Sequence, residues 1–339
     1  MPNNDEYPLL IDVNEDDLLA LSIEVLDTLL CDHTTGKNIF WASHDYEALG
    51  KEYDYHSQIL PKLIIGENKM VVRPRVLKSK EEQTDRAKDM AEVFTPSWVC
   101  NAQNNLVDEA WFGCKDVFNI EDTTNHTWKA TSNKIEFPDG KSWKDYVSST
   151  RMEITCGEAP YLVSRYDATT GEIIPLQNRI GLLDRKLRIV TENTDSREEW
   201  IYWTRVAYQN IYGYEWQGDN LLLARKALLY TFIEYYHATF IMAPPTKYLK
   251  EIADIISWNL WQMDGLKGVV PDSCHDVVSK HKAVPQLDLF STDIPQESNP
   301  KVSPCPGCAE DNIYKHNGTY CKIYDWEKKK ALRYIDLIK

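Results

Sequence analysis

The longest hydrophobic patterns along the chain have the period of an α-helix. Apolar side chains recur every three or four residues, which places them on one face of a helix. The spacing predicts helices over residues 18–30, 97–107, 180–189, 197–208, 219–240 and 246–263. Pro96 can stand at the first turn of the second helix. The apolar residues of that helix are expected in the core, namely Trp98, Val99, Leu106 and Val107.

Shorter apolar runs that are bounded by turn residues predict strands. They cover residues 38–42, 70–77, 151–155, 211–215 and 266–270, and Pro74 interrupts the second run. Glu153 lies near the end of one run, Glu215 ends another, and Asp264 follows the last predicted helix. Because acid-ended strands here precede helices, we expect a mostly parallel α/β sheet with these three acids at adjacent strand ends.

Composition favours a folded α/β protein. The 339 residues can form one large domain with attached segments, and 43% hydrophobic residues exclude global disorder. No apolar run approaches the roughly 18 residues that span a bilayer, and the N-terminus lacks the pattern of a secretory signal. We therefore expect a cytoplasmic protein with no membrane contact. In that compartment, eight cysteines indicate thiols or metal ligands instead of disulfides.

The formal charge of −14 argues against a protein that binds nucleic acid alone, because phosphate contacts need Lys and Arg. The charge is unevenly distributed, however. The segment 1–30 carries eight acids and no Lys or Arg, whereas the segment 61–90 has eight basic side chains and five acids. DNA contact through the basic segments, shared with a partner, is consistent with this balance.

Four short segments stand out by their residues and by their order along the chain. They are Ala91–Pro96, Arg151–Leu162, Tyr212–Glu215 and Gln262–Leu266. Small residues in the second segment, at Cys156 and Gly157, let a ligand approach the backbone. In this order and spacing the segments resemble the adenine-specific (N6) DNA methyltransferases of restriction-modification systems, M-subunit type. The resemblance covers roughly half of the chain.

The resemblance implies a Rossmann-like fold that depends on S-adenosylmethionine. Its Phe-Thr-Pro would cap the methionine part of the cofactor, Glu215 would hold the ribose and Asp264 would meet the adenine amine. The implied cofactor-binding residues are Phe94, Thr95, Pro96, Glu153, Cys156, Gly157, Glu215 and Asp264. Ile154 and Pro160 stand where the family loop has Pro and Gly.

The catalytic motif of that family is missing. Its Asn/Asp-Pro-Pro-aromatic tetrapeptide binds the target amine and stacks on the flipped base, and the sequence contains no such run. Asp325-Trp326 stands where the family order would place the catalytic strand end, so these two residues are the candidate base-site pair. Methyl transfer would then need a partner or an unusual motif.

The C-terminal segment has the ligand spacing of a zinc knuckle with a longer middle loop. Cys305, Cys308, His316 and Cys321 form the pattern Cys-x2-Cys-x7-His-x4-Cys. Three thiolates and an imidazole satisfy tetrahedral zinc, and metal could stabilise a segment too small for a core of its own. The alternative is three reduced cysteines in a basic tail.

These patterns divide the chain into four parts. Residues 1–90 are a mixed α/β region, 91–270 a methyltransferase-like domain, 271–303 a linker or mobile loop, and 304–339 the zinc-binding segment. Three functions remain open. They are a DNA adenine methyltransferase subunit, a non-catalytic DNA- or protein-binding subunit with the same fold, and a zinc-bearing adaptor with an unrelated ligand. The resemblance implies a specificity, restriction or second methyltransferase subunit as partner.

Overall fold

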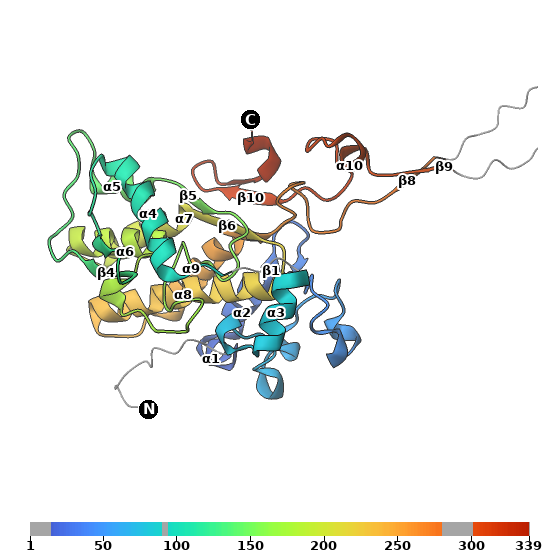
Figure 1. Cartoon of the computed structure of the whole chain (residues 1–339), viewed down its shortest axis with the longest axis horizontal. Helices are drawn as coiled ribbons and strands as arrows, with labels where there is room; N and C mark the ends of the chain where they lie inside the picture. The colour runs from blue at the N-terminus through green and yellow to red at the C-terminus, as the bar shows by residue number, and fades with distance from the viewer. Residues whose placement is uncertain (1–14, 90–93, 280–300, 339) are drawn as a thin grey trace, which may run out of the picture.

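The computed structural model describes residues 15–89, 94–279 and 301–338, and it has a mixed α/β architecture (Figure 1). Most of the acidic head, residues 91–93 of the first motif and most of the predicted linker lie outside the described residues. The helices that flank the centre of the molecule were predicted from their spacing, and the structure confirms them. These are α6 (Leu182–Asn193), α7 (Arg197–Gln209), α8 (Gly218–Phe240) and α9 (Thr246–Asn259).

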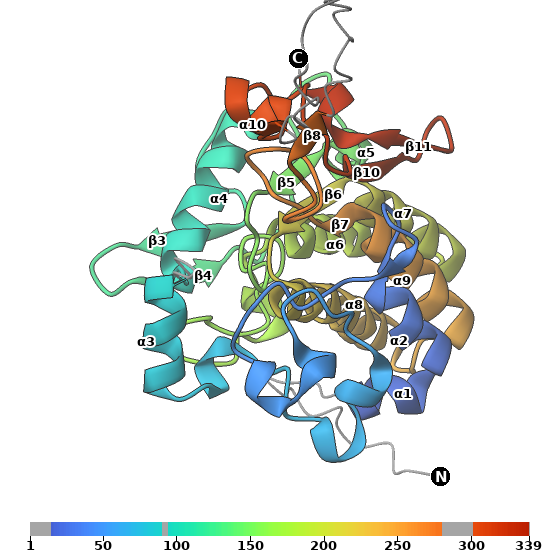
Figure 2. The same cartoon turned by 90° about the vertical axis from the view of Figure 1, so that its right-hand side faces the viewer.

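A parallel three-stranded sheet lies at the centre of the fold. Its order is β5 (Arg151–Glu153), β6 (Ile211–Glu215) and β7 (Leu260–Gln262). Glu153 pairs with Gly213 and Glu215 pairs with Gln262, so the carboxyl ends of the strands lie at one edge. Helices α6 and α7 connect β5 to β6, and α8 and α9 connect β6 to β7, as parallel crossovers require. Figure 2 shows α4 (Ser97–Phe112) on one side of the strands and α9 on the other.

Two predictions after α9 are wrong. The predicted helix 246–263 stops at Asn259, because residues 260–262 form β7 instead. The predicted strand 266–270 is a turn, in which the backbone N–H groups of Lys267 and Gly268 both donate to the carbonyl of Asp264. Asp264 therefore lies just beyond the end of β7.

Arg225 of α8 joins three elements in the core. This guanidinium is fully buried and donates to the backbone carbonyls of Leu29, Cys31, Ser257 and Leu260. These carbonyls belong to the ends of α2 (Ile23–Leu30) and α9, where a helix leaves its last carbonyls without intrahelical partners. One buried cation thus replaces several C-terminal caps.

Lys186 of α6 is a second buried cation that binds backbone carbonyls. Its ammonium group is buried and donates to the carbonyls of Val147, Ser149 and Asn210. Burial lowers the pKa of Lys186 well below its ordinary value. The contact ties the end of α5 (Trp143–Ser148) to the residues that precede β5 and β6.

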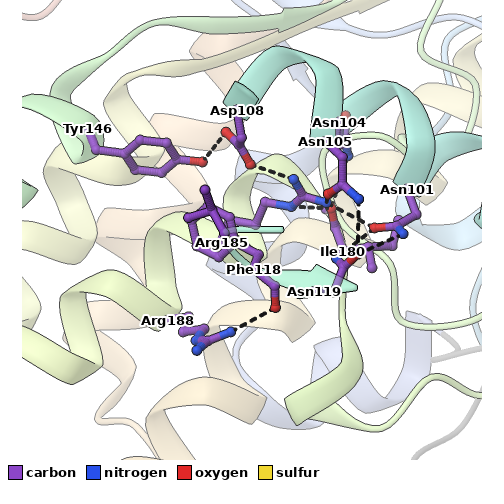
Figure 3. A network of polar contacts seen from close by, with 12 residues as sticks. Asn101, Asn104, Asn105, Asp108, Phe118, Asn119, Tyr146, Ile180, Arg185 and Arg188 are labelled. Carbon is purple, nitrogen blue, oxygen red and sulfur yellow. Dashed lines mark hydrogen bonds and ion pairs between the residues drawn. The ribbon is translucent and has the colours of Figure 1, made fainter. Parts of the chain in front are cut away.

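Helix α4 presents a polar face to the interior, contrary to the prediction from its apolar residues. Trp98, Leu106 and Val107 are exposed, whereas the buried face carries Asn101, Asn104 and Asp108. Figure 3 shows the reason, which is the buried guanidinium of Arg185 on α6. It forms an ion pair with Asp108 and donates to the side-chain oxygens of Asn101 and Asn105. A buried cation requires such partners, so polar residues occupy this face.

The N-terminal region wraps around the helical layer and has little regular structure. It begins with α1 (Glu15–Leu21) and α2, and β1 (Cys31–Asp32) pairs with β2 (Lys37–Asn38). Of the predicted strand 38–42, Asn38 belongs to β2 and Phe40 forms an isolated bridge, and the predicted strand 70–77 is absent. Pro74 instead precedes the short helix η5. The 3₁₀ helices are η1 (Glu47–Leu49), η2 (Lys51–Tyr53), η3 (Pro61–Leu63), η4 (Gly66–Asn68) and η5 (Arg75–Leu77).

The remaining elements are short. They are α3 (Lys80–Asp89), the hairpin of β3 (Asn119–Asp122) and β4 (Thr127–Ala130), η6 (Leu176–Asn178), and the C-terminal β8 (Val277–Ser279), β9 (Lys301–Ser303), α10 (Pro306–Glu310), β10 (Lys322–Asp325), β11 (Lys330–Arg333) and η7 (Tyr334–Leu337). Strand β8 pairs with β9, and β10 with β11, both antiparallel. None of the helices among the described residues has the length and apolar character to cross a bilayer.

Candidate functional site

A cavity of about 970 Å³ lies at the carboxyl ends of β5 and β6. Parallel α/β sheets bind ligands at this edge, beyond the ends of their strands. Six of the eight predicted cofactor residues contribute to its lining: Phe94, Thr95, Glu153, Cys156, Gly157 and Glu215. They come from three segments of the sequence, which the parallel sheet and the start of α4 bring together.

The carboxylate of Glu153 organises the loop that follows β5. It accepts hydrogen bonds from the backbone N–H groups of Tyr161 (3.4 Å) and Leu162 (3.2 Å). Thr155, Gly157 and Ala159 adopt left-handed backbone conformations in between, with φ of 47°, 53° and 63°. The loop therefore curls around the end of its own strand. Burial raises the pKa of Glu153 well above that of an ordinary carboxyl group, although the two N–H donors act against the rise.

Glu215 holds the same loop from the neighbouring strand. Its Oε2 accepts from the backbone N–H of Gly157 at 2.8 Å, and its Oε1 accepts from that of Gln217 at 3.3 Å. Only 8% of the residue is exposed, and burial raises its pKa. Each carboxylate oxygen can accept more than one hydrogen bond, so Glu215 keeps acceptor capacity toward the cavity.

The charge of the cavity lining has one sign. Two carboxylates, Glu153 and Glu215, contribute to the lining, and none of the described lining residues is Lys or Arg. His44 is the one histidine among the described lining residues. Such a lining favours ligands that carry positive charge or hydroxyl groups and disfavours phosphates.

Two predicted cofactor residues lie outside this lining. Pro96 stands just before α4, where its carbonyl accepts from the N–H groups of Val99 and Cys100. Asp264 is 4% exposed and is used by its own turn. Its Oδ1 accepts from the N–H groups of Leu266 (3.0 Å) and Lys267 (3.2 Å), and its Oδ2 pairs with the ammonium of Lys267 at 3.0 Å.

The predicted base-site pair lies away from the cavity. Asp325 is at the end of β10, where it forms an ion pair with Lys328. The indole N–H of Trp326 donates to the side chain of Asn259 at 2.9 Å. Asn259 directly precedes β7, so Trp326 lies at the amino end of that strand. The cavity is at the opposite edge, because the strands are parallel.

An aromatic wall at one end of the cavity was not predicted. Tyr55, Trp216 and His44 contribute to it, and the hydroxyl of Tyr55 accepts from the indole N–H of Trp216 at 2.9 Å. Trp216 directly follows Glu215, so its position in the sequence was a usable signal. Tyr55 and His44 come from the N-terminal region, and nothing in the local sequence connects them to the end of β6, which is distant along the chain.

A second cavity of about 770 Å³ adjoins this wall and shares His44 and Tyr55 with the first. Its other lining residues are Glu47, Asp54, His56, Ser57 and Asp272. His44 Nδ1 lies 2.6 Å from a carboxylate oxygen of Glu47. Asp272 belongs to the segment that leads to the C-terminal cysteines.

A second site lies in the C-terminal part of the chain. The Sγ atoms of Cys274, Cys305 and Cys308 lie 3.6, 3.7 and 3.6 Å from His316 Nδ1, and all four ligand atoms are within 4.8 Å of one another. Tetrahedral zinc with bonds of about 2.3 Å to sulfur and about 2.05 Å to nitrogen separates such atoms by about 3.6 Å. The four groups could therefore hold a metal ion such as zinc.

The predicted ligand Cys321 is not part of this cluster, and Cys274 takes its place. Cys321 is fully buried in a small apolar cluster with Tyr214 and Trp261, and its thiol donates to the carbonyl of Gln262. Sequence spacing favoured Cys321 because it follows His316 closely. Cys274 lies far upstream of the other ligands in the sequence, so only the return of the chain brings it to them.

The turn between Cys305 and Cys308 is fitted closely to His316. A Cβ atom on Gly307 would lie 2.5 Å from the backbone nitrogen and from Nδ1 of His316, so only glycine fits there. The N–H of Asn317 donates to Cys305 Sγ at 3.3 Å. Such outer hydrogen bonds are typical of thiolates that bind a metal.

Comparison with known proteins gives no assignment. No protein-family model, no curated protein and no solved structure matches the chain. The geometry of the two sites is therefore the basis for a function.

Proposed function

We propose that the cavity at the ends of β5 and β6 binds S-adenosylmethionine, in a Rossmann-like arrangement of the kind found in DNA adenine methyltransferases. One observation carries the proposal. Glu153 and Glu215, which end adjacent parallel strands, contribute to one cavity together with Phe94 and Thr95. The four motifs that suggested this cofactor are far apart in sequence, and three of them contribute to this lining.

The charge of the lining separates S-adenosylmethionine from other adenosine cofactors. Its sulfonium and ammonium groups are cations, which the carboxylates of Glu153 and Glu215 attract. Nucleoside triphosphates and nicotinamide dinucleotides carry phosphates instead, and these need cationic side chains or free backbone N–H groups. The described lining contains no Lys or Arg, and the loop N–H groups of Gly157, Tyr161 and Leu162 already donate to carboxylates.

The residues of the cavity suggest how the cofactor would lie. Glu215 would accept from the ribose hydroxyls, and the amino-acid part would lie near Glu153 and Phe94. The adenine would then lie toward the wall of Tyr55 and Trp216, because Asp264 is occupied by its own turn. A volume of about 970 Å³ is at the upper end for small-molecule sites, which leaves room for part of a second substrate.

The methyl acceptor that we propose is an adenine amine in DNA, with a partner subunit that supplies what this chain lacks. Asp325 and Trp326 are at the other edge of the sheet from the proposed cofactor, so they are not assigned to catalysis. The net charge of −14 argues against DNA binding by this chain alone, so the partner would contribute part of the DNA-binding surface. A non-catalytic subunit that binds the cofactor or DNA without transfer is the second candidate, and the missing tetrapeptide favours it.

Calorimetric titration with S-adenosylmethionine tests the cofactor. Wild type should bind it and should not bind ATP. Glu215→Ala should weaken binding about tenfold to a hundredfold, because a hydrogen bond to a charged group contributes about 1.5–3 kcal/mol. Glu172→Ala, which removes an exposed acid outside the lining, is the matched control. Absence of binding in wild type, or equal affinity in Glu215→Ala, would remove the proposal.

Transfer is measured separately. Labelled S-adenosylmethionine and adenine-containing duplex DNA are incubated with the chain alone and with the products of neighbouring genes. Label on DNA supports the methyltransferase subunit. Cofactor binding with no label on DNA under either condition favours the non-catalytic subunit.

For the C-terminal cluster we propose a structural zinc ion held by Cys274, Cys305, Cys308 and His316. Three thiolates and one imidazole leave no open coordination position. Among the described residues of segment 302–320, only Cys305 and Gly307 are buried, so the metal would replace a hydrophobic core.

A further inference from the structure

Residues 270–275 connect the cluster of Cys274, Cys305, Cys308 and His316 to the second cavity. Asp272 contributes to the second cavity, and Cys274, which follows it closely, belongs to the cluster. Asp272 has a left-handed backbone conformation with φ of 53°. Asp adopts this conformation more readily than most residues with a side chain.

The same segment is hydrogen-bonded to the residues that follow His316. The N–H of Val270 donates to the carbonyl of Thr319 at 2.8 Å, and the N–H of Thr319 donates to Ser273 Oγ at 3.0 Å. The N–H of His275 donates to the side chain of Asn317 at 3.1 Å. Asp272 thus belongs to a segment that is hydrogen-bonded to residues 317–319. The candidate metal ligands Cys274 and His316 are next to these two hydrogen-bonded segments.

On its other side, Asp272 reaches the aromatic wall through Tyr55. Both residues contribute to the second cavity, and Tyr55 also contributes to the first. Burial and the neighbouring Asp272 carboxylate raise the pKa of Tyr55 to about 12, while the hydrogen bond from Trp216 lowers it. Tyr55 and Asp272 therefore face the same cavity, and the Tyr55 hydroxyl accepts from the indole N–H of Trp216. Trp216 directly follows Glu215, so the contacts extend to the proposed ribose-binding residue.

We propose that Asp272 and Tyr55 are positioning residues that connect the metal centre to the cavity wall, so that cofactor affinity depends on metal occupancy. The inference rests on the proposed binding of S-adenosylmethionine. Metal bound by Cys274 and His316 fixes the connection that carries Asp272. Asp272 and Trp216 then fix the hydroxyl of Tyr55, and the ring of Tyr55 completes the cavity beside Glu215.

The first test compares zinc-loaded and metal-stripped wild type by calorimetric titration with S-adenosylmethionine. We expect the stripped protein to bind about tenfold more weakly, and zinc to restore the affinity. Equal affinity in the two forms would overturn the inference and leave the proposed function standing.

Two variants on the same segment provide a matched pair. Asp272→Ala removes the carboxylate beside Tyr55, so the zinc-loaded variant should bind as weakly as stripped wild type. Asp276→Ala removes an exposed carboxylate on the other side of Cys274 that does not line either cavity, so it should behave as wild type. Tyr55→Phe keeps the ring and loses the hydroxyl. Its affinity for S-adenosylmethionine should therefore be the same with and without the metal. Cobalt absorption from thiolate coordination checks that each variant still holds metal.

Hydrogen exchange of the protein without cofactor gives a readout that does not depend on the proposed function. On removal of metal, peptides that cover residues 53–57 and 214–218 should exchange faster, whereas peptides from α6 and α7 should not change. Unchanged exchange at 53–57 would overturn the inference, whether or not S-adenosylmethionine binds. If removal of the metal unfolds the protein, the two zinc-loaded variants Asp272→Ala and Asp276→Ala are compared instead. Equal affinity of these two variants for S-adenosylmethionine would overturn the inference.

Discussion

Glu215 Oε2 accepts a hydrogen bond from the backbone N–H of Gly157 at 2.8 Å, so the acid that ends β6 holds the loop that follows β5. The loop also curls around Glu153, the acid that ends its own strand. Two carboxylates therefore set the shape of the cavity before any ligand arrives. A ligand cation would find them already in place, which reduces the reorganisation that binding requires.

Gly157→Ala should lower both stability and cofactor affinity. Gly157 has φ of 53°, and an added Cβ would lie 4.0 Å from the Phe94 ring, so backbone strain is the main effect. We expect a loss of about 1 kcal/mol in unfolding free energy, measured by denaturant titration, and weaker binding of S-adenosylmethionine. Gly140→Ala is the matched control, since Gly140 has φ of 77° with open space around it and lies outside the cavity. It should lose similar stability and keep its affinity.

Cofactor affinity should rise with pH. Burial raises the pKa of both Glu153 and Glu215 in the free protein, so part of each carboxyl population is protonated above the ordinary range. A cationic ligand binds the ionised form, so binding lowers these pKa values and releases protons. Calorimetry in two buffers of different ionisation enthalpy measures the release. Proton uptake, or affinity that falls as pH rises, would contradict the assignment of these two acids.

Asp219→Asn should destabilise the protein at neutral pH and have little effect in acid. Burial opposes ionisation of Asp219, but Arg86 and Lys78 outweigh it and hold the pKa well below its ordinary value. Stability from this pairing is present above the unfolded-state pKa and is lost as pH falls toward the folded-state pKa. We expect a loss of about 3–5 kcal/mol at pH 7, measured by urea unfolding. The difference from wild type should shrink steadily below about pH 4.

Arg225→Met should destabilise the protein severely. It leaves the buried carbonyls of Leu29, Cys31, Ser257 and Leu260 without their donor, and each unsatisfied group costs about 1–3 kcal/mol. Denaturant unfolding should show a loss of at least about 3 kcal/mol. Arg333→Met, which removes an exposed ion pair with Asp336, should change stability by less than about 1 kcal/mol. A small effect at Arg225 would mean that water replaces the guanidinium.

Cys274→Ser should lose metal, whereas Cys321→Ser should keep it. Elemental analysis of wild type is expected to give about one zinc per chain. The serine hydroxyl at 274 is a poor zinc ligand, so that variant should bind far less metal and melt at a lower temperature. At position 321 the substitution changes only a buried thiol. Zinc lost from Cys321→Ser and retained in Cys274→Ser would restore the ligand set that sequence spacing suggested.

Patterns among neighbouring residues were enough to locate four helices and two strands. Helical spacing located α6, α7, α8 and α9, because each must bury a continuous apolar face. Apolar runs that include Glu153 and Glu215 located β5 and β6. The motif order also identified six of the residues that contribute to the cavity, since parallel strands place their ends at one edge. What the sequence misassigned depends on partners that are distant along the chain.

The remaining features depend on long-range contacts that no local pattern encodes. Arg185 requires polar partners, so α4 buries Asn101 and Asp108 and leaves Leu106 exposed. Cys274 joins the cluster and Cys321 does not, because the chain that leaves Cys274 returns beside it at Cys305. Tyr55 contributes to the cavity although it belongs to the N-terminal region. The spacing of apolar residues predicts local secondary structure. Which distant residues come into contact depends instead on the burial of charges and the closure of long loops.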